Sequence, residues 1–316
     1  MPAEENAIKV LAQLWRMSRA VLARDRQVEV RLRRDVDAVI YDRPGLWMDD
    51  DALASLREDV RSVARAAVPG DLGYGVLRDE RGPYENRLVV VARHRETGEV
   101  AGFNALPWLD VRLGARRVTV MHFGLLIIHP RYQRQGLQGL LYGLGAFSAY
   151  HRVKERPLWI SNVTEVPAVF GAVCDQVQAP YPDYRARAAP TPLHRALAAA
   201  IMAQHRHEFG VGPEAGFDEE RFVITGSYTG GSDALKKTFE SAPAYREATC
   251  NSFCRAQLDY ARGDDFLQIG QLDATVITNW ITRRIPTDLR PALARRMKLW
   301  SYPAPARAAT EEGARE

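Results

Sequence analysis

Apolar residues recur at helical spacing in two parts of the N-terminal region. Positions 8, 11, 15, 18 and 22, all apolar except Ser18, fall on one side of a helix. A second helix is expected to start at Asp50 or Asp51, because either carboxylate can accept hydrogen bonds from the free amides of a first turn. Its apolar side would carry positions 53, 56, 60 and 63, and Pro69-Gly70 would end it. Residues 1–70 are therefore expected to form a helical region packed on the core.

The pattern changes to strands after residue 83. Residues 88–95, 100–111 and 116–128 are rich in β-branched and other apolar residues and are separated by turn sequences, which predicts three consecutive antiparallel strands. A proline-bearing break follows, and then a glycine-bearing loop that leads into a helix ending near residue 153. Residues 157–163 predict a buried strand, and residues 166–176 predict another helix.

The C-terminal third has weaker signals. Leu193, Leu197 and Ile201 mark a helix. Beyond it we expect a strand over residues 221–228, helical structure over 233–262 and an extended segment over 266–280. The chain then divides into a helical region (1–70), a core (71–185) and an α+β region (186–316), the last of which would supply a ligand pocket or an oligomer surface.

Composition restricts the class of protein. The 316 residues are 46% hydrophobic and 26% charged, as in an ordinary globular protein, and 43 basic against 39 acidic residues give a net charge of +4. This slight excess suits anionic ligands without requiring nucleic acid, and Arg31, Arg33 and Arg34 are expected to form a solvated surface. Three cysteines cannot form a disulfide framework, and no apolar stretch approaches the ~20 residues that span a bilayer. A cytoplasmic protein without a membrane span is expected, and Cys250 and Cys254 have no second ligand pair that would make a metal site.

The segment from Gln133 to Gly139 carries the clearest chemistry. It lies between an apolar strand and a helix, where free backbone amides and the helix dipole form a site for an anion such as a pyrophosphate. Gly136 would let the backbone approach that anion, and Arg131 and Arg134 would add contacts to phosphate oxygens. The alternative is that the glycines serve only a tight turn. The segment is neither a Walker loop nor the G-x-G-x-x-G dinucleotide fingerprint.

The run over residues 128–141, IHPRYQRQGLQGLL, resembles the signature of the GNAT acyltransferase superfamily, Arg/Gln-x-x-Gly-x-Gly/Ala. Gln133 and Gly136 match its first and fourth positions, whereas Gln138 departs at the sixth. The order of helices, strands and loop over residues 85–180 also agrees with that family. The resemblance implies an α/β fold with a GNAT-like mixed, mostly antiparallel central sheet flanked by helices, and with N-terminal helical and C-terminal α+β additions.

The resemblance also implies how a donor would bind. Acyl-coenzyme A would lay its phosphopantetheine along the end of the fourth strand, and its pyrophosphate would rest on the loop. The strand residues are Leu125, Leu126, Ile127 and Ile128, the loop residues are Gln133, Arg134, Gln135, Gly136, Leu137, Gln138 and Gly139, and Asn162 resembles the asparagine that closes the fifth strand. Because the long Gln138 side chain replaces a small residue, an acyl carrier protein, which presents phosphopantetheine without ADP, is a second candidate donor. No metal is expected.

The same resemblance places a catalytic base on the strand before the loop. Histone-type members carry a glutamate about eleven residues before the first loop position, and here that position holds His122. Histidine is a competent base near neutral pH without any perturbation, and the alternative is a hydrogen-bonded core histidine. Phe170 stands where many members have the tyrosine that protonates the leaving thiolate, so the proton donor stays unassigned.

These expectations describe an N-acyltransferase that moves an acyl group to an amine within a ternary complex. The acceptor would be a small molecule or a peptide, nucleic acid is not expected as a partner, and the C-terminal region is large enough for a homodimer surface. Two other classes stay open. One is a GNAT-fold protein that binds or senses coenzyme A or acyl-lipid without catalysis, and the other is an interaction protein that keeps only the fold.

Overall fold

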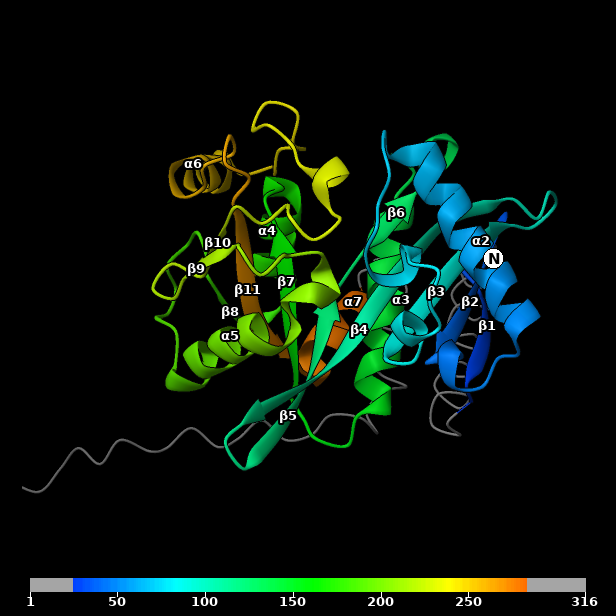
Figure 1. Cartoon of the computed structure of the whole chain (residues 1–316), viewed down its shortest axis with the longest axis horizontal. Helices are drawn as coiled ribbons and strands as arrows, with labels where there is room; N and C mark the ends of the chain where they lie inside the picture. Colours follow the sequence, from blue (N-terminus) through cyan, green and yellow to red (C-terminus); the bar gives the residue numbers. More distant parts are fainter. Residues whose placement is uncertain (1–24, 283–316) are drawn as a thin grey trace, which may run out of the picture.

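One sheet runs through the protein, which a computed structural model describes over residues 25–282 (Figure 1). Its strands pair in the order β1-β2-β3-β4-β5-β7-β11-β10-β9, with β6 paired to β4 and β8 to β11. Only β5 and β7 are parallel among these described pairs, so the expected mixed, mostly antiparallel α/β sheet is confirmed. The strands are β1 (Gln27–Arg31), β2 (Val36–Asp42), β3 (Arg87–His94), β4 (Val100–Leu113), β5 (Arg116–Phe123), β6 (Leu126–Ile128), β7 (Leu158–Thr164), β8 (Gln178–Tyr181), β9 (Gly216–Asp218), β10 (Val223–Thr225) and β11 (Asp265–Leu272).

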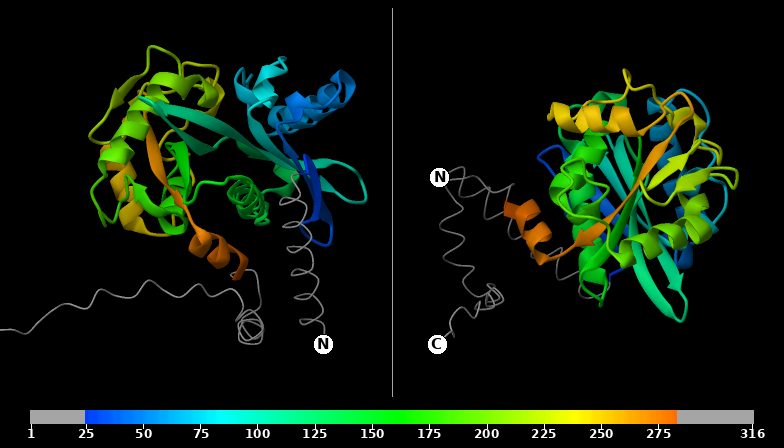
Figure 2. Two further views of the ribbon diagram at one scale, coloured as in Figure 1. Left: turned by 90° about the horizontal axis from the view of Figure 1, so that it is seen from below. Right: turned by 90° about the vertical axis from the view of Figure 1, so that its left-hand side faces the viewer.

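Helices cover both faces of this sheet, and Figure 2 shows α2 and α3 on opposite sides of it. In β3, Val89 and Val91 pack beneath α2, whereas Leu88 and Val90 pack beneath α3. This two-sided burial explains why residues 88–92 of β3 are all apolar instead of alternating with polar residues. The helices are α2 (Asp50–Ala67), α3 (Leu137–Arg152), α4 (Pro167–Gln176), α5 (Pro192–His205), α6 (Ala248–Gln257) and α7 (Ala274–Thr282), and the 3-10 helices are η1 (Pro44–Leu46), η2 (Gly75–Leu77), η3 (Gly82–Tyr84), η4 (Pro130–Tyr132), η5 (Arg206–Phe209) and η6 (Asp233–Leu235).

The N-terminal region is only partly helical. α2 forms as expected, although Asp49 rather than Asp50 or Asp51 caps it, by accepting a hydrogen bond from the Ala52 amide at 2.8 Å. The helical expectation is wrong over residues 27–42, where β1 and β2 extend the sheet. Buried and exposed positions alternate along β1 with the two-residue period of a half-buried strand. The first expected helix, at positions 8–22, lies outside the described residues.

The strand expected over residues 116–128 is interrupted at Gly124 and Leu125. β5 pairs with the second half of β4, and β6 pairs with its first half. Pro107 lies between these two pairings, and its nitrogen has no hydrogen with which to continue the ladder. Gly124 comes so close to β4 that a Cβ there would lie 2.3 Å from the Ala105 carbonyl oxygen. The interruption therefore has a cause in each of two neighbouring strands.

This interruption separates two strands that run side by side up to that point (Figure 1). β5 pairs in parallel with β7 as far as Phe123 and Asn162. Beyond them, the only described strand that pairs with β6 is β4, so β6 and the end of β7 diverge. We call this region the wedge; residues 123–128 form one side and residues 162–165 the other. Residues 123–126 are half-buried although they lie in the middle of the sheet.

The C-terminal region departs further from expectation. The helix at Leu193, Leu197 and Ile201 is confirmed as α5. Of the strand expected over 221–228, only β10 forms, and the helical structure expected over 233–262 is limited to η6 and α6. The extended segment over 266–280 ends with β11. There the Asp273 carboxylate accepts a hydrogen bond from the Val276 amide at 2.8 Å and starts α7.

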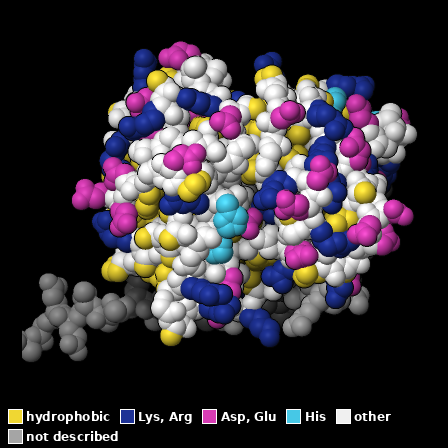
Figure 3. All heavy atoms as spheres, in the orientation of Figure 1, with side chains coloured by type: hydrophobic (Ala, Val, Ile, Leu, Met, Phe, Trp, Pro, Cys, Tyr) yellow, Lys and Arg dark blue, Asp and Glu magenta, His cyan; other side chains and the backbone are white. Residues whose placement is uncertain are grey.

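The surface over α2 and α5 shows acidic and basic side chains interspersed (Figure 3). Pairs such as Arg61 with Asp79 and Arg117 with Asp110, both at 2.6 Å, contribute to this pattern. Within residues 25–282, no helix is long and apolar enough to cross a membrane.

Gly124→Ala should destabilise the protein and disturb the wedge. The added methyl group would collide with the Ala105 carbonyl oxygen and with Pro107 Cδ, which lies 2.9 Å from the ideal Cβ position. Overpacking of this kind costs about 1–3 kcal/mol, which urea unfolding can measure. Gly82→Ala is the control, because a Cβ there meets nothing within 4 Å. Equal stability of the two variants would contradict the close approach of Gly124 to β4.

Candidate active site

The loop before α3 presents a run of backbone amides, most of them on exposed residues. Among the described residues, none accepts a hydrogen bond from the amides of residues 134–138. Gly136 caps the helix at a φ of +74° and has no side chain that could accept hydrogen bonds from these amides. The first turn of α3 contains no acidic residue that could do so. Four of these five residues are exposed, and the fifth, Leu137, packs in the core. A helix N-terminus of this kind attracts anions, as the sequence analysis expects.

Arginines from three segments lie around this loop. Arg33 Nη1 donates to the Gln135 carbonyl oxygen at 3.1 Å, and its side chain is 22% exposed, whereas Arg31 and Arg34 are exposed as expected. Arg131 is held by Glu99 at 2.9 Å, which leaves it less available to a ligand. Arg134 is exposed at a φ of +60° and forms no ion pair with any residue from 25 to 282. Arg33 Nη2 also lies 3.3 Å from Asp35 Oδ2, so Arg134 is the one of these three arginines without a carboxylate partner among the described residues.

The residues expected to hold a phosphopantetheine form one side of the wedge. Leu126, Ile127 and Ile128 belong to β6, whereas Leu125 lies in the interruption, where its carbonyl oxygen accepts from the Ala105 amide at 2.9 Å. Gln133 Nε2 donates to the Ile128 carbonyl oxygen at 3.1 Å and ties the loop to the strand. The unpaired edge of β6 therefore continues directly into the loop with the free amides.

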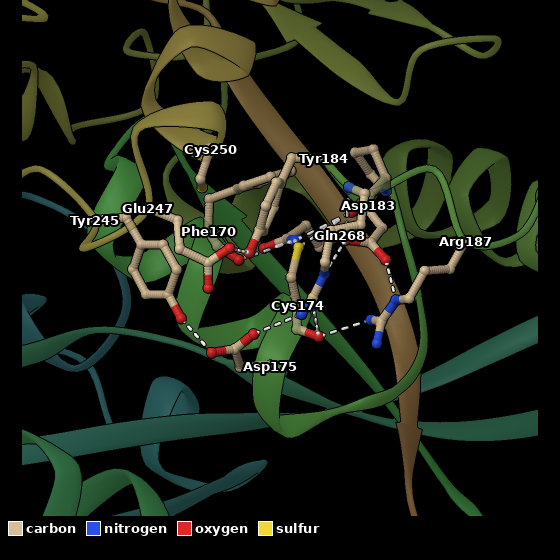
Figure 4. Close-up of polar contacts among 12 residues, drawn as sticks. Phe170, Cys174, Asp175, Asp183, Tyr184, Arg187, Tyr245, Glu247, Cys250 and Gln268 are labelled. Carbon is tan, nitrogen blue, oxygen red and sulfur yellow. Dashed lines mark hydrogen bonds and ion pairs between the residues drawn. The ribbon is translucent and has the colours of Figure 1, made fainter.

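Asn162 is fixed by a buried network beneath α4. Its side chain is 1% exposed, and Nδ2 donates to Gln268 Oε1 at 3.1 Å. Gln268 Nε2 in turn lies 3.2 Å from the Pro182 carbonyl oxygen and 3.4 Å from Cys174 Sγ, an arrangement visible in Figure 4. This network anchors the end of β7, and a contact of Asn162 with a donor stays a prediction.

His122 lies one residue before the end of β5 and is 2% exposed. Its Nδ1 is 2.9 Å from Ser161 Oγ, and its ring stacks on Phe209 with the centroids 4.8 Å apart. Burial, with a smaller effect of the Arg87 guanidinium, lowers the pKa of His122 to about 3, so the imidazole is neutral at physiological pH. These contacts are those of a hydrogen-bonded core histidine, and its role as a base stays a prediction.

Two buried carboxyl groups lie near the end of β7: Glu165, which the sequence predicts to favour the start of a helix and not to be catalytic, and Asp265, which no sequence pattern singles out. Glu165 is 1% exposed and Asp265 is 3% exposed. The Tyr228 hydroxyl lies 3.4 Å from Asp265 Oδ1, and the Lys237 amide donates to Glu165 Oε1. Glu165 Oε2 is buried and accepts no hydrogen bond within the described ranges.

Burial raises the pKa of Glu165 to about 8 and that of Asp265 to about 7. Both groups therefore exchange protons near neutral pH, as an acid or base must. In the sequence, Glu165 has the ordinary appearance of a carboxylate favoured at the start of a helix, so no local signal distinguishes it.

A cavity of about 250 Å³ lies between α3, α4 and α7 beside the wedge. Tyr142 and Phe123 line it, with their ring centroids 5.8 Å apart. Burial raises the pKa of Tyr142 to about 12, and its hydroxyl makes no hydrogen bond to the residues the structure describes. Phe170, which takes the place of the family tyrosine, is instead fully buried against Phe253 and Phe266. Tyr142 is thus a hydroxyl beside the wedge that sequence reasoning missed.

Comparison with known proteins finds similarity only among solved structures, since no protein-family model and no curated protein matches the chain. Nourseothricin acetyltransferase is 15% identical over 25% of this chain and 41% of its own, with a TM-score of 0.19. The GNAT family N-acetyltransferase YhbS from Escherichia coli, in complex with CoA, is 22% identical over 43% of this chain and 66% of its own, with a TM-score of 0.24. An acetyltransferase of the GNAT family from Streptococcus pneumoniae is 13% identical over 75% of this chain and 99% of its own, with a TM-score of 0.30. The chain spans less than two thirds of the first two proteins.

The chain's own elements carry the fold assignment. The order along the chain is the one that the resemblance of residues 128–141 implies: a meander of three strands, the loop, a helix, a buried strand and another helix. The interruption between β5 and β6 is a feature that the structure adds. The fold is GNAT-like. In this GNAT-like fold the loop and the free edge of β6 adjoin the wedge, and His122, Tyr142 and Glu165 lie around it. No group of three or more His, Cys, Asp or Glu side chains in the described chain could hold a metal ion.

Glu165→Gln should make the protein's stability less sensitive to pH between about 5 and 8. A carboxyl group whose pKa is raised by folding keeps its proton in the folded state and loses it in the unfolded state, so its contribution to stability falls as the pH rises through this range. As the pH rises, the free energy of unfolding of the variant should increase relative to that of the wild type by up to a few kcal/mol, which unfolding at a series of pH values can measure. Glu219→Gln, at an exposed position, is the control. A constant difference between Glu165→Gln and wild type across the range would contradict the raised pKa.

Proposed function

We propose that this protein transfers an acyl group from a thioester donor to an amine. The donor is acyl-coenzyme A, or the phosphopantetheine of an acyl carrier protein. The observation that carries this proposal is the line of free backbone groups that runs from the edge of β6 into the amides of residues 134–138. A phosphopantetheine arm offers amide groups to a strand edge, and a pyrophosphate offers an anion to a helix N-terminus.

The surroundings of Gln138 favour coenzyme A as the donor. Gln138 is exposed in the first turn of α3, and no described residue holds its side chain over the loop amides. Arg134, which forms no ion pair among the described residues, adds positive charge that suits a pyrophosphate. A carrier protein is the alternative donor, which would bind through phosphopantetheine alone.

The proposed reaction needs a neutral amine and a proton for the leaving sulfur. The amine nitrogen attacks the thioester carbon, the C–N bond forms and the C–S bond breaks; the proton that nitrogen loses balances the one that sulfur gains. We assign acceptance of the amine proton to His122, which is neutral and lies next to Phe123 at the apex of the wedge. We assign donation of a hydrogen bond to the sulfur to Tyr142, which lines the cavity beside Phe123. Most of the rate gain would come from holding the amine against the thioester.

Glu165 is the competing candidate for the base. A base works best when its pKa is near the working pH, and the pKa of about 8 at Glu165 meets this condition better than the value of about 3 at His122. The two assignments differ in the pH dependence that they impose, which makes them separable by kinetics.

A non-catalytic protein that binds coenzyme A or acyl-lipid is the second candidate function. It is favoured by the buried, stacked His122 and by Phe170, which fills the position of the family's acid with a core side chain. Such a protein would bind the donor but show no turnover with any amine.

Acyl-coenzyme A should stabilise the wild type, and Gly136→Glu should abolish that effect. A ligand at 100 times its Kd adds about 2.7 kcal/mol to the free energy of unfolding, which a thermal-shift series with coenzyme A, acetyl-coenzyme A and a long-chain acyl-coenzyme A can detect. The new glutamate places negative charge among the free amides. Gly114→Glu is the matched control, because its φ of +61° and open surroundings resemble those of Gly136 at +74°, but it lies in the β4–β5 turn. No shift with any of the three ligands would exclude coenzyme A as the donor.

His122→Ala should lower turnover by about 10²–10⁴-fold while the thermal shift with the donor persists. Glu165→Gln is measured beside it across pH 6 to 9. With His122 as the base, both wild type and Glu165→Gln should lack a kinetic pKa near 8. Unchanged turnover in His122→Ala, together with loss of a pKa near 8 in Glu165→Gln, would transfer the role to Glu165.

A further inference from the structure

A second open site lies at the opposite end of the β5–β7 pair from the wedge. This groove has a volume of about 760 Å³ and is lined by the first residues of β5, the loop between α3 and β7, and the end of β2. Arg116 at the start of β5 lies roughly 23 Å of extended strand away from Phe123 at the wedge. The groove is therefore separate from the donor loop and its free amides.

Positive charge collects in this groove. Arg43, Arg116, Lys154 and Arg156 line it and are exposed, and none of them forms an ion pair within residues 25–282. A fifth cation, Arg152, is already held by Asp42 at 3.0 Å and by the Asp25 carbonyl oxygen at 2.8 Å. Glu155 is the one other carboxylate in the lining. Once Asp42 and Arg152 are set aside as a pair, four cations and the single carboxylate of Glu155 remain among the described residues of the lining.

Aromatic rings, not carboxylates, hold two of these cations. The Arg43 guanidinium lies 5.8 Å from the centre of the Trp108 ring, and Arg156 lies 4.5 Å from the centre of the Tyr150 ring. Contact with a ring face orients a guanidinium but leaves its N–H donors free in the plane of the group. The Arg43 backbone is fixed as well, at a φ of +49° with its amide bonded to the Arg87 carbonyl oxygen at 2.8 Å. The Arg43 and Arg156 guanidinium groups are thus oriented, and no described residue forms an ion pair with either of them.

The charge and the size of the groove select its ligand. A volume of this order is that of a small-molecule site, too small for a macromolecule to enter and large enough for a nucleotide. Guanidinium groups match phosphate oxygens in a paired geometry, and an excess of several positive charges is balanced by a di- or triphosphate but not by a single carboxylate. Val118, Trp159 and Leu193 supply an apolar wall for the part of the ligand without charge. We propose that this basic groove binds a small phosphorylated molecule of nucleotide size.

This proposal does not depend on acyl transfer, and calorimetric titration with inorganic tripolyphosphate at low salt tests it. Because the loop before α3 is itself proposed to hold a pyrophosphate, Gly136→Glu is titrated in parallel and should still bind tripolyphosphate through the basic groove. The double variant Arg116→Glu/Lys154→Glu should bind it about 100-fold more weakly, since two charge-assisted contacts are lost at about tenfold each. Both side chains are exposed, so circular dichroism and thermal unfolding should show an intact fold.

Arg117→Glu is the matched control in the same strand, because Arg117 is paired with Asp110 at 2.6 Å and does not line the groove. Its affinity should stay within about threefold of wild type, as expected for an exposed pair. Uridine triphosphate should compete with tripolyphosphate on the wild type.

Three results would overturn the proposal: no binding by the wild type, equal binding by wild type and the double variant, or loss of binding in Gly136→Glu with retention in the double variant. The last result would place the anion at the donor loop instead.

Discussion

The arrangement of the site depends on one local conflict in the sheet, where β4 cannot hold a single partner strand along its whole length. Pro107 has no N–H to offer, and Gly124 on the other strand approaches the Ala105 carbonyl oxygen too closely for any side chain. β5 therefore ends, and β6 resumes on the first half of β4 alone. Because β7 stays paired with β11, the two strands diverge, and the free edge of β6 points at the loop before α3. A continuous ladder here would leave no unpaired backbone for a donor.

Burial around the wedge fixes the protonation of its titratable groups. In a low-dielectric interior the neutral form is favoured for every ionisable side chain, so the same cause lowers the pKa of His122 and raises those of Glu165 and Asp265. Exclusion of water from this region therefore favours the neutral form of the imidazole and of both carboxyl groups. The proposed acyl transfer would benefit from this water-poor region, because an amine must be neutral to attack a thioester.

The sequence predicts the part of the fold that follows local periodicity. The three-strand meander, α2, α3 and α4 form close to where apolar spacing places them, and the loop is visible because Gly136 needs a positive φ that few residues adopt. The interruption at Gly124 could not be predicted, since its cause includes Pro107 in a neighbouring strand. Glu165 and Asp265 are likewise 100 positions apart, and only the pairing of β7 with β11 brings them to the same end of the sheet. The helical expectation for residues 1–70 rests on apolar spacing at positions 8–22 and 53–63, whereas residues 27–42 form β1 and β2, along which buried positions alternate with more exposed ones.

The two ends of the β5–β7 pair differ in how an anion would be held, and this difference decides what a sequence can reveal. In the loop before α3, the groups that would donate hydrogen bonds to the anion are backbone amides, which nearly every residue carries. Only the glycine spacing that shapes this loop is therefore recorded in the sequence. In the basic groove the donors are side chains from three separate segments, and their significance appears only once the fold removes other partners from them. The first kind of site leaves a motif and the second leaves none. A search by motif therefore finds the donor loop, whereas the groove is found by asking which buried or converging charges remain uncompensated.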